Sequence, residues 1–124
     1  MAMKTILVVE DDSTMRDLLR LHLSNAGYAV RTAPNGLEAW NAITGLIPDL
    51  IITDVYMPQV NGFKFVQALR TRPALKDVPV IFLTVDADNS ERGKALGAVE
   101  YLKKPIQLHV LLSTVAKHLP LTGA

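Results

Sequence analysis

The sequence holds 124 residues, with 13 Lys and Arg against 12 Asp and Glu, which gives a formal net charge of +1 at pH 7. That length fits one domain of ~100–200 residues, and a composition of 49% hydrophobic and 20% charged residues excludes a disordered tail. Because the chain has no cysteine, disulfides, thiolate metal sites and cysteine nucleophiles are excluded, and the charge balance lacks the basic excess of a nucleic-acid-binding protein.

The chain opens with a predicted strand followed by a predicted helix. Thr5–Val9 is apolar and rich in β-branched residues, which indicates a strand. Apolar residues then recur at helical spacing from Thr14 onward. We expect Asp12 or Ser13 to cap this helix and Gly27 to end it in the left-handed conformation.

A half-covered strand and a second helix come next. Tyr28–Thr32 alternates apolar and polar residues, which indicates an edge strand. Asn35–Thr44 has a helical apolar period that Gly45 ends. The residues expected to face inward from this helix are Leu37, Trp40 and Ile43.

Three further strand–helix pairs complete the alternation. The strands are predicted at Leu50–Thr53, Val80–Leu83 and Glu100–Lys103. The helices are predicted after the Met57–Asn61 loop, at about Ser90–Leu96, and from Pro105 onward. The helix at Ser90–Leu96 has few large apolar residues, so we expect it to be weakly packed.

These five strand–helix units predict an α/β fold with a doubly wound parallel sheet. Parallel neighbours need connections of about a dozen residues or more, which the helices supply. The first, third and fourth strands are nearly continuous apolar runs and suit the sheet interior, whereas the second and fifth are mixed and suit its edges. Strand order 2-1-3-4-5 satisfies both conditions. We expect residues 1–124 to form a single domain with no output domain.

Polar side chains stand where the predicted strands stop. Glu10 and Asp11 follow the first strand, Asp54 the third, Thr84 the fourth and Lys104 the fifth. Because the carboxyl ends of parallel strands lie along one edge of a sheet, these side chains converge beside the point where the strand order reverses. Each residue alone has an ordinary role as a turn, cap or surface residue. It is the set that indicates a ligand site.

The carboxylates of this set repel one another. Two unit charges ~4 Å apart oppose each other by about 4 kcal/mol at an effective dielectric of roughly 20, and Lys104 offsets only one charge. A hard divalent cation complements the remainder, and Mg²⁺ characteristically combines carboxylates, waters and a phosphate. We therefore expect Mg²⁺ together with a phosphoryl group, with Lys104 and Thr84 on the phosphoryl oxygens and Asp54 as the nucleophile.

At these residues the chain resembles the receiver domain of two-component response regulators. The resemblance rests on Val8-Val9-Glu10-Asp11, Asp54-x-x-Met57-Pro58 with Gly62 beyond, Thr84, and Lys104-Pro105. It extends over about Lys4 to His118 and implies a flavodoxin-like (βα)5 fold. It also implies a phospho-accepting signalling domain, not an enzyme, with Mg²⁺-dependent self-phosphorylation from a donor and slow autodephosphorylation. Ser13-Thr14-Met15-Arg16 further resembles the single-domain chemotaxis-type members.

The resemblance implies a role for each acidic residue. Asp54 is the expected phospho-acceptor and hence the modified residue, and it takes the phosphoryl group from the phosphohistidine of a kinase. Asp11, Asp54 and the backbone carbonyl of Tyr56 are the expected Mg²⁺ ligands. Glu10 is expected to act on the metal mainly through bound water.

The resemblance also implies a switch. Thr84 and Lys104 are expected to contact the phosphoryl oxygens, and the Lys104–Pro105 bond is expected to be cis. Thr84 would move toward the phosphoryl group and leave space that Tyr101 fills, although an edge-strand aromatic that covers the core is the simpler role for Tyr101. The helix at Ser90–Leu96, the strand of Tyr101 and the last helix would form the face that a partner binds.

Some positions depart from the family pattern. Val85 stands where receiver domains usually have Ala or Gly, and its methyl groups would narrow access to the site. Asp12 is a third consecutive acid. The metal role is given to Asp11 and not to Asp12 only because of the position of Asp11 in the motif. Tyr56 and Asp86 lie at positions where family members tune the lifetime of the phosphoryl group.

Three other functions remain open from the sequence. A phosphatase with an aspartyl-phosphate intermediate needs a second carboxylate two residues after its nucleophile, where this chain has Tyr56. A flavin-binding module needs hydroxyl and N–H groups in its first loop, where this chain has Glu10-Asp11-Asp12. The third alternative is an interaction domain that works without phosphorylation. As a receiver, the chain fits a phosphorelay shuttle as well as chemotaxis.

The expected partners follow from the receiver interpretation. They are a sensor histidine kinase or phosphotransfer protein and a downstream target protein, with no direct contact to nucleic acid and a monomer or weak dimer as the assembly. The strictly apolar runs are shorter than the ~18 residues of a membrane span, and acids, not small residues, follow the first run. We therefore expect a cytoplasmic protein without membrane insertion.

Overall fold

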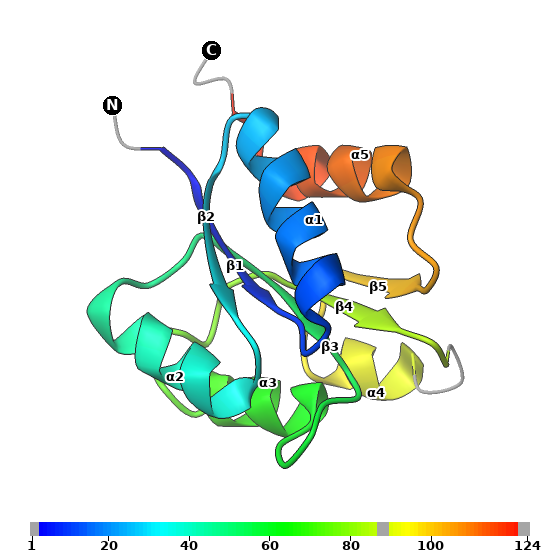
Figure 1. Ribbon diagram of the computed structural model, residues 1–124. Helices are drawn as coiled ribbons and strands as arrows, with labels where there is room; N and C mark the ends of the chain where they lie inside the picture. Colours follow the sequence, from blue (N-terminus) through cyan, green and yellow to red (C-terminus); the bar gives the residue numbers. More distant parts are fainter. Residues whose placement is uncertain (1–2, 87–89, 122–124) are drawn as a thin grey trace.

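Strands and helices alternate throughout the computed structural model, which describes residues 3–86 and 90–121 (Figure 1). The strands are β1 (Thr5–Val9), β2 (Ala29–Ala33), β3 (Leu50–Asp54), β4 (Val80–Thr84) and β5 (Glu100–Lys103). The helices are α1 (Ser13–Asn25), α2 (Gly36–Gly45), α3 (Gly62–Arg70), α4 (Ser90–Ala95) and α5 (Leu108–His118). Across the two described ranges, no helix is both long enough and apolar enough to cross a membrane.

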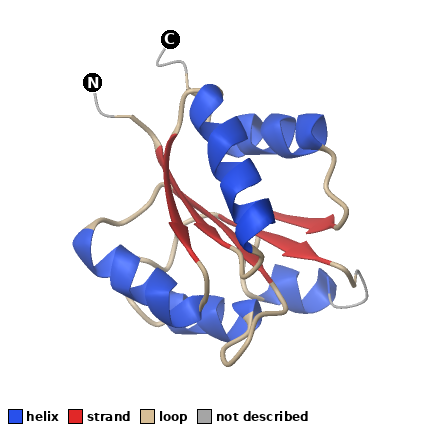
Figure 2. Cartoon of the chain, in the orientation of Figure 1, coloured by secondary structure: helices blue, strands red, loops and turns tan. Residues whose placement is uncertain are grey.

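The five strands form one parallel sheet in the order β2-β1-β3-β4-β5, which confirms the predicted order. The three interior strands are buried on both faces except at Thr5, and the two edge strands are mixed. Helices α1 and α5 cover one face of the sheet, and α2, α3 and α4 cover the other (Figure 2). The fold is therefore a doubly wound, flavodoxin-like α/β sheet.

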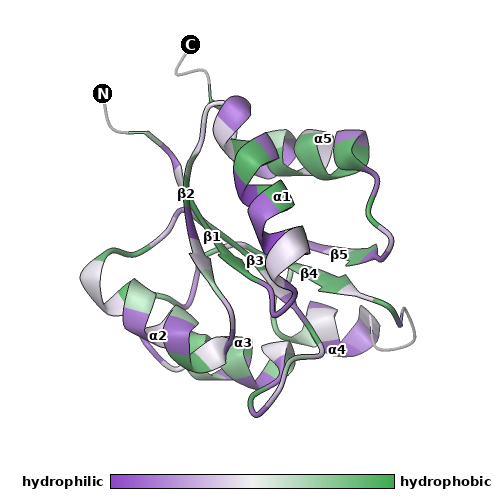
Figure 3. Cartoon of the chain, in the orientation of Figure 1, coloured by the Kyte–Doolittle hydropathy of each residue, from purple (hydrophilic) through white to green (hydrophobic). Residues whose placement is uncertain are grey.

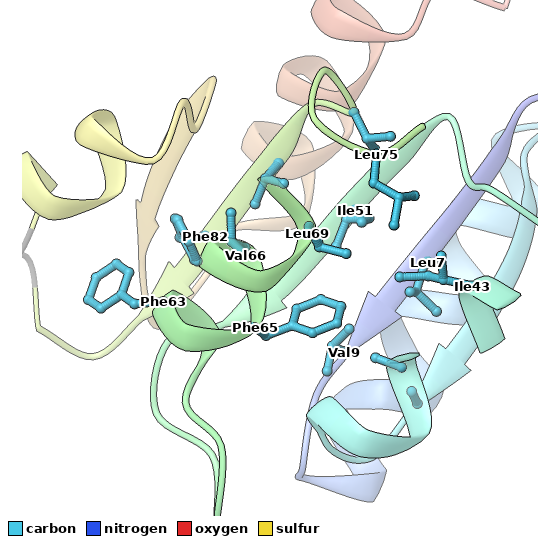
Figure 4. Close-up of a cluster of buried hydrophobic side chains, with 14 of the residues drawn as sticks. Leu7, Val9, Ile43, Ile51, Phe63, Phe65, Val66, Leu69, Leu75 and Phe82 are labelled. Carbon is cyan, nitrogen blue, oxygen red and sulfur yellow. The ribbon is translucent and has the colours of Figure 1, made fainter. Parts of the chain in front are cut away.

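Each face of the sheet has its own hydrophobic core, because successive strand residues point to opposite sides. Ile6 and Val8 pack with α1 and α5, while Leu7 and Val9 pack with α2 and α3 (Figure 4). Hydrophobic colouring runs along the central strands, as expected of strands covered on both sides (Figure 3). Each fully buried Leu or Ile contributes about 1.5–3 kcal/mol relative to an exposed one.

The ends of α1 are fixed by the residues that the sequence indicates. The Asp12 side chain caps the helix and accepts a hydrogen bond from the Thr14 N–H at 2.9 Å. Gly27 follows the helix with a φ of 111°, a left-handed conformation that favours glycine. The Tyr28 N–H still donates to the Leu23 carbonyl at 3.2 Å, so β2 begins one residue later than predicted, at Ala29.

The predicted inward face of α2 is wrong at Leu37, whose surface is 61% exposed. Asn35 caps the helix by accepting from the Glu38 N–H at 2.8 Å. This phase turns Gly36, Ala39 and Ile43 toward the sheet, and the first two of these buried residues are small. Small residues let the helix lie close to the core, so Leu37 faces outward.

The predicted start of the last helix at Pro105 is also wrong, because α5 begins at Leu108. Gln107 is the N-cap residue with an extended backbone (φ −77°, ψ 131°) and no side-chain capping bond. Ile106 packs against the core of the α1–α5 face, so the chain runs across this core before it can turn into a helix. The Lys104–Pro105 peptide bond is cis, as the family resemblance implied.

The start of α3 is packed directly against the end of β3. The Gly62 N–H donates to the Val55 carbonyl at 2.7 Å, and a Cβ at position 62 would collide with the carbonyl oxygen of Asp54. Asn61 caps α3 by accepting from the Lys64 N–H at 2.9 Å. Glycine is therefore required at position 62, and the segment that follows Asp54 is held at both ends.

Candidate functional site

The polar residues predicted at the strand ends meet at one edge of the sheet. Asp54 and Thr84 are the last residues of β3 and β4, and Glu10 and Lys104 are the first residues after β1 and β5. The strands are in register there, with Asp54 opposite Leu83 and Thr84 opposite Lys103. Parallel pairing thus brings together residues that are up to 94 positions apart.

A single ammonium group joins two buried carboxylates in this cluster. Lys104 Nζ lies 2.8 Å from Glu10 Oε1 and 2.7 Å from Asp54 Oδ1. Glu10 is 0% exposed and Asp54 3% exposed, whereas the Lys104 side chain is 20% exposed. The Lys104 N–H also donates to the Thr84 carbonyl at 2.6 Å. The lysine is therefore held by its backbone and its side chain at the same place.

Three carboxylates form a group that could hold a metal ion. Oxygens of Glu10, Asp11 and Asp54 all lie within 4.8 Å of one another, and Asp11 is the exposed member. Asp12 has a separate role, because its side chain caps α1 and its N–H donates to Glu10 Oε2 at 3.2 Å. The structure thus places Asp11 with the other two acids and Asp12 outside the group.

One atom of this cluster has an unmet bonding capacity. Asp54 Oδ2 is buried and, across residues 3–86 and 90–121, no donor forms a hydrogen bond with it. With all groups ionised, Glu10, Asp11 and Asp54 carry three negative charges and Lys104 one positive charge. A set of carboxylate oxygens with excess negative charge suits a hard divalent cation such as Mg²⁺. The donor chemistry therefore fits the expected ion.

The pKa values of the two buried acids, Asp54 and Glu10, are shifted in opposite directions. Burial and the interaction with Glu10 raise the pKa of Asp54 to about 8, and Lys104 offsets only part of this effect. Burial also disfavours ionised Glu10, but hydrogen bonds from Asp54, Lys104 and the Asp12 backbone lower its pKa on balance. Burial works against the charge of Lys104, yet Asp54 and Glu10 raise its pKa. A cation at the site would favour ionised Asp54.

Hydroxyl groups and Asp86 form the rim of the site. Thr84 Oγ1 accepts from the Asp86 N–H at 3.1 Å, and the Tyr56 hydroxyl donates to Asp86 Oδ2 at 3.2 Å. The Tyr101 hydroxyl donates to the Asp86 carbonyl at 3.2 Å, while its ring stacks on Phe63 with centroids 6.4 Å apart. Tyr101 thus covers the core, the simpler of its two expected roles, and also contacts the rim.

Sequence reasoning missed two contacts that shape the site. Arg16 Nη1 donates to the Glu10 carbonyl at 2.9 Å and so ties α1 to the end of β1. Asp86 was expected only as a position that tunes the phosphoryl group, but it bonds to both tyrosines and to Thr84. No sequence signal predicts either contact, because each depends on how separate elements pack.

Comparison with known proteins places this chain in a family. A family model described as the response regulator receiver domain matches residues 6–116. An uncharacterized 14.6 kDa protein of Leptolyngbya boryana is 38% identical over 120 residues, which is 95% of this chain and 92% of that protein. The chain spans about half the length of several other curated relatives, which are named as transcriptional or response regulators.

Solved structures give the same result. The chemotaxis response regulator CheY4 of Vibrio cholerae has a TM-score of 0.89 and 38% identity, and the match covers 95% of this chain and 100% of that one. The response regulator TrrA of Thermotoga maritima, solved in complex with Mg(2+)-BeF, has a TM-score of 0.84 and 34% identity, over 94% of this chain and 100% of that one.

Proposed function

Because the chain belongs to the response regulator receiver domain family, whose members are phospho-accepting signalling switches of two-component systems, we propose that Asp54 is its phospho-acceptor. The donor is a sensor histidine kinase or a phosphotransfer protein. The observation that carries the proposal is the buried Asp54 carboxylate, which has one oxygen paired with Lys104 and the other without a hydrogen bond from the described residues.

The proposed reaction needs mainly positioning and charge neutralisation. A carboxylate oxygen of Asp54 attacks the phosphorus of the donor, the new O–P bond forms, and the bond between phosphorus and the donor's leaving atom breaks with its electron pair. Lys104 Nζ and the Thr84 hydroxyl bind the phosphoryl oxygens and stabilise their charge. An in-line transfer of this kind requires little covalent chemistry from other side chains.

Mg²⁺ is the proposed cofactor. Glu10, Asp11, Asp54 and the backbone carbonyl of Tyr56 would hold it, with Glu10 acting mainly through water. When bound, the ion neutralises charge shared by the carboxylates and the phosphoryl oxygens. The clustered carboxylate oxygens support this assignment, as does the Mg(2+)-BeF complex of the related protein TrrA.

The proposed output is a change in the face formed by α4, β5 and α5. Helix α4 has six residues, and Gly93 is its buried residue, so little apolar burial fixes its position. Thr84 and Tyr101 both contact Asp86, which connects the site to this face. A downstream partner would read the shift. Hydrogen exchange with and without a phosphoryl mimic tests this step, and unchanged protection across residues 84–118 would contradict it.

Labelling by a small phosphodonor tests the acceptor itself. The protein is incubated with Mg²⁺ and the donor, and a single acid-stable, base-labile adduct is located by mass at Asp54. Asp54→Asn should abolish the adduct. Asp17→Asn, an exposed carboxylate on α1, is the matched control and should label like the wild type. An adduct that persists in Asp54→Asn, or that forms equally without Mg²⁺, would refute the proposal.

The proposal leaves the pathway open. The Leptolyngbya boryana relative and CheY4 are similar to this chain over 92% and 100% of their lengths. A phosphorelay and a chemotaxis pathway remain equally suitable settings. The cytoplasmic location and the monomeric or weakly dimeric state stay predictions.

A further inference from the structure

A second recognition surface lies between α2 and α3, away from the face assigned to the output. Two hollows of about 220 Å³ and about 200 Å³ lie on either side of Trp40, which lines both. We refer to this pair of hollows as the Trp40 groove. The two helices that border it run side by side on one face of the sheet (Figure 1).

The groove is built around a fixed aromatic side chain. The Trp40 ring packs edge-on against Phe65 with centroids 6.2 Å apart, and Figure 4 shows Phe65 pointing from α3 toward the strand residues beneath it. The Arg72 guanidinium lies 5.2 Å from the centroid of the Trp40 ring. Contacts on two sides thus hold the indole in place between the hollows, and an anchoring aromatic of this kind is typical of binding surfaces.

The two ends of the groove are apolar and open. Leu37, at the edge of one hollow, is 61% exposed, and Ile47, at the edge of the other, is 45% exposed. Leu37, Trp40 and Thr44 follow one another at helical spacing along α2, over about 10 Å. That length matches two turns of a second helix laid beside them, with one large apolar side chain for each hollow.

The charges around the groove select the occupant. Lys64 lines one hollow and Arg72 the other, and of the described residues that line either hollow none is acidic. Within residues 3–86 and 90–121, no carboxylate forms an ion pair with Lys64 or Arg72. Both cations are exposed and available to an incoming carboxylate. A second copy seated on a two-fold axis would bring like charges together, because each copy would present the same two cations.

We propose that the Trp40 groove binds an amphipathic, acidic helix of a partner protein. Apolar side chains about one or two turns apart on that helix fill the two hollows, and flanking carboxylates pair with Lys64 and Arg72. This surface is separate from the α4–β5–α5 face, so the proposal stands or falls without the phospho-acceptor assignment.

The test uses a labelled probe peptide and the single tryptophan of the chain. The probe is an end-capped helical peptide of Leu, Ala and Glu, with leucines at positions i, i+3 and i+7 and glutamates on both flanks. Saturable binding is measured by anisotropy of the labelled peptide and by the change in Trp40 emission. A peptide with lysine in place of every glutamate is the charge control, and a scrambled peptide of the same composition is the pattern control.

The decisive variant is the double charge reversal Lys64→Glu with Arg72→Glu. We expect it to weaken binding of the acidic peptide by about tenfold or more, since two exposed ion pairs become two repulsive pairs. The double variant Arg20→Glu with Lys117→Glu makes the same change in net charge on α1 and α5 and should leave affinity within about twofold. Circular dichroism checks that both variants are folded.

Three results would overturn the proposal. The first is no saturable binding of the acidic peptide below about 1 mM. The second is equal affinity for the acidic, basic and scrambled peptides, or equal affinity in the two double variants. The third is a concentration-dependent dimer that Lys64→Glu with Arg72→Glu disrupts, because the occupant would then be a second copy. Phosphodonor labelling of Asp54 is unaffected in each case, so failure here is distinct from failure of the proposed function.

Discussion

Asp54 and Glu10 are two buried carboxylates that share the ammonium of Lys104. Burial and the interaction with Glu10 make Asp54 the acid that holds a proton, with its pKa raised to about 8 from a usual value of 3.8. Folded protein therefore retains a proton that the unfolded carboxyl group releases above that usual value. This difference makes the stability of the metal-free protein depend on pH.

We predict that the free energy of unfolding of the metal-free wild type falls, relative to Asp54→Asn, as the pH rises from about 5 to about 8. The folded state binds more protons in this window, so its stability decreases with pH, at up to ~1.4 kcal/mol per pH unit. Glu10, with a lowered pKa, and Lys104, with a raised one, titrate outside this window. Urea unfolding in EDTA at several pH values measures the difference.

Asp54→Asn is the reference against which the wild type is compared in this experiment. The amide cannot ionise, and the titratable groups outside the cluster are common to both proteins, so their contributions cancel in the difference. If the two proteins show the same dependence on pH, Asp54 does not hold a proton in the folded state.

Val85 lies beside the site and its surface is 67% exposed. Val85 follows Thr84 in the chain and adds two methyl groups beside it. The Thr84 hydroxyl is proposed to bind the phosphoryl oxygens. We predict that Val85→Ala labels faster with a small phosphodonor, because less apolar surface stands at the entrance. Initial rates of adduct formation at Asp54, followed by mass, measure this. An equal or slower rate would contradict the prediction.

Arginine side chains connect α4 and the residue that follows it to neighbouring elements. The Arg92 guanidinium lies 4.7 Å from the centroid of the Phe63 ring. Arg70 on α3 donates from Nε to the Leu96 carbonyl at 2.9 Å and from Nη1 to the Val78 carbonyl at 2.8 Å. These contacts hold the C-terminal end of α4, the end that leads to β5. The apolar face of the helix itself is small.

Gly93 is a point at which α4 lies close to β5. A Cβ there would lie 2.9 Å from Tyr101 Cδ2 and 3.3 Å from Phe82 Cδ2. We predict that Gly93→Ala displaces the Tyr101 ring outward and destabilises the protein by about 1–3 kcal/mol. Urea unfolding measures the cost, and loss of ring contacts between Tyr101 and Phe82 in NMR spectra detects the displacement.

Gly45→Ala is the matched control for this substitution. Gly45 ends α2, and an added Cβ there would meet nothing within 4 Å. Alanine should therefore stabilise the helix by about 0.5–1 kcal/mol. If Gly93→Ala is as stable as Gly45→Ala and leaves the ring contacts in place, the close approach does not position Tyr101.

The elements show which structural features the sequence alone predicts. The apolar runs of β1, β3 and β4 predicted their interior positions correctly, because burial on both faces removes the alternation of polar residues. Convergence of Asp54 and Lys104 followed from parallel pairing alone. Sequence periodicity placed Leu37 on the wrong face of α2, because the phase of that helix depends on how closely Gly36 lies to the core. It also placed the start of α5 too early, because that start depends on where Ile106 packs.

At the scale of the whole molecule, the proposed metal binding is linked to folding. A cation held by Glu10, Asp11 and Asp54 would bind the folded chain and so raise its stability, by ~2.7 kcal/mol at a concentration of 100 times Kd. We predict a rise in Tm with Mg²⁺ that is larger at about pH 8 than at about pH 5, because protons compete for Asp54. Thermal unfolding with Mg²⁺ and with EDTA measures it.

Asp11→Asn tests whether this shift comes from the carboxylate cluster. Asp11 is exposed, so the substitution should leave the metal-free Tm nearly unchanged and reduce the Mg²⁺-dependent rise. Asp17→Asn on α1 should leave both unchanged. A rise that is equal at both pH values, or equal in Asp11→Asn, would place the stabilising ion elsewhere.

The bond between Lys104 and Glu10 spans 94 positions of the chain. During synthesis on a ribosome, both buried acids are therefore made long before Lys104, whose ammonium joins them. A nascent chain that ends before β5 lacks this ammonium, and a truncated product of that kind would have to keep the two carboxylates without it. Labelling at Asp54 is thus expected only from chains that have been made and assembled through Lys104.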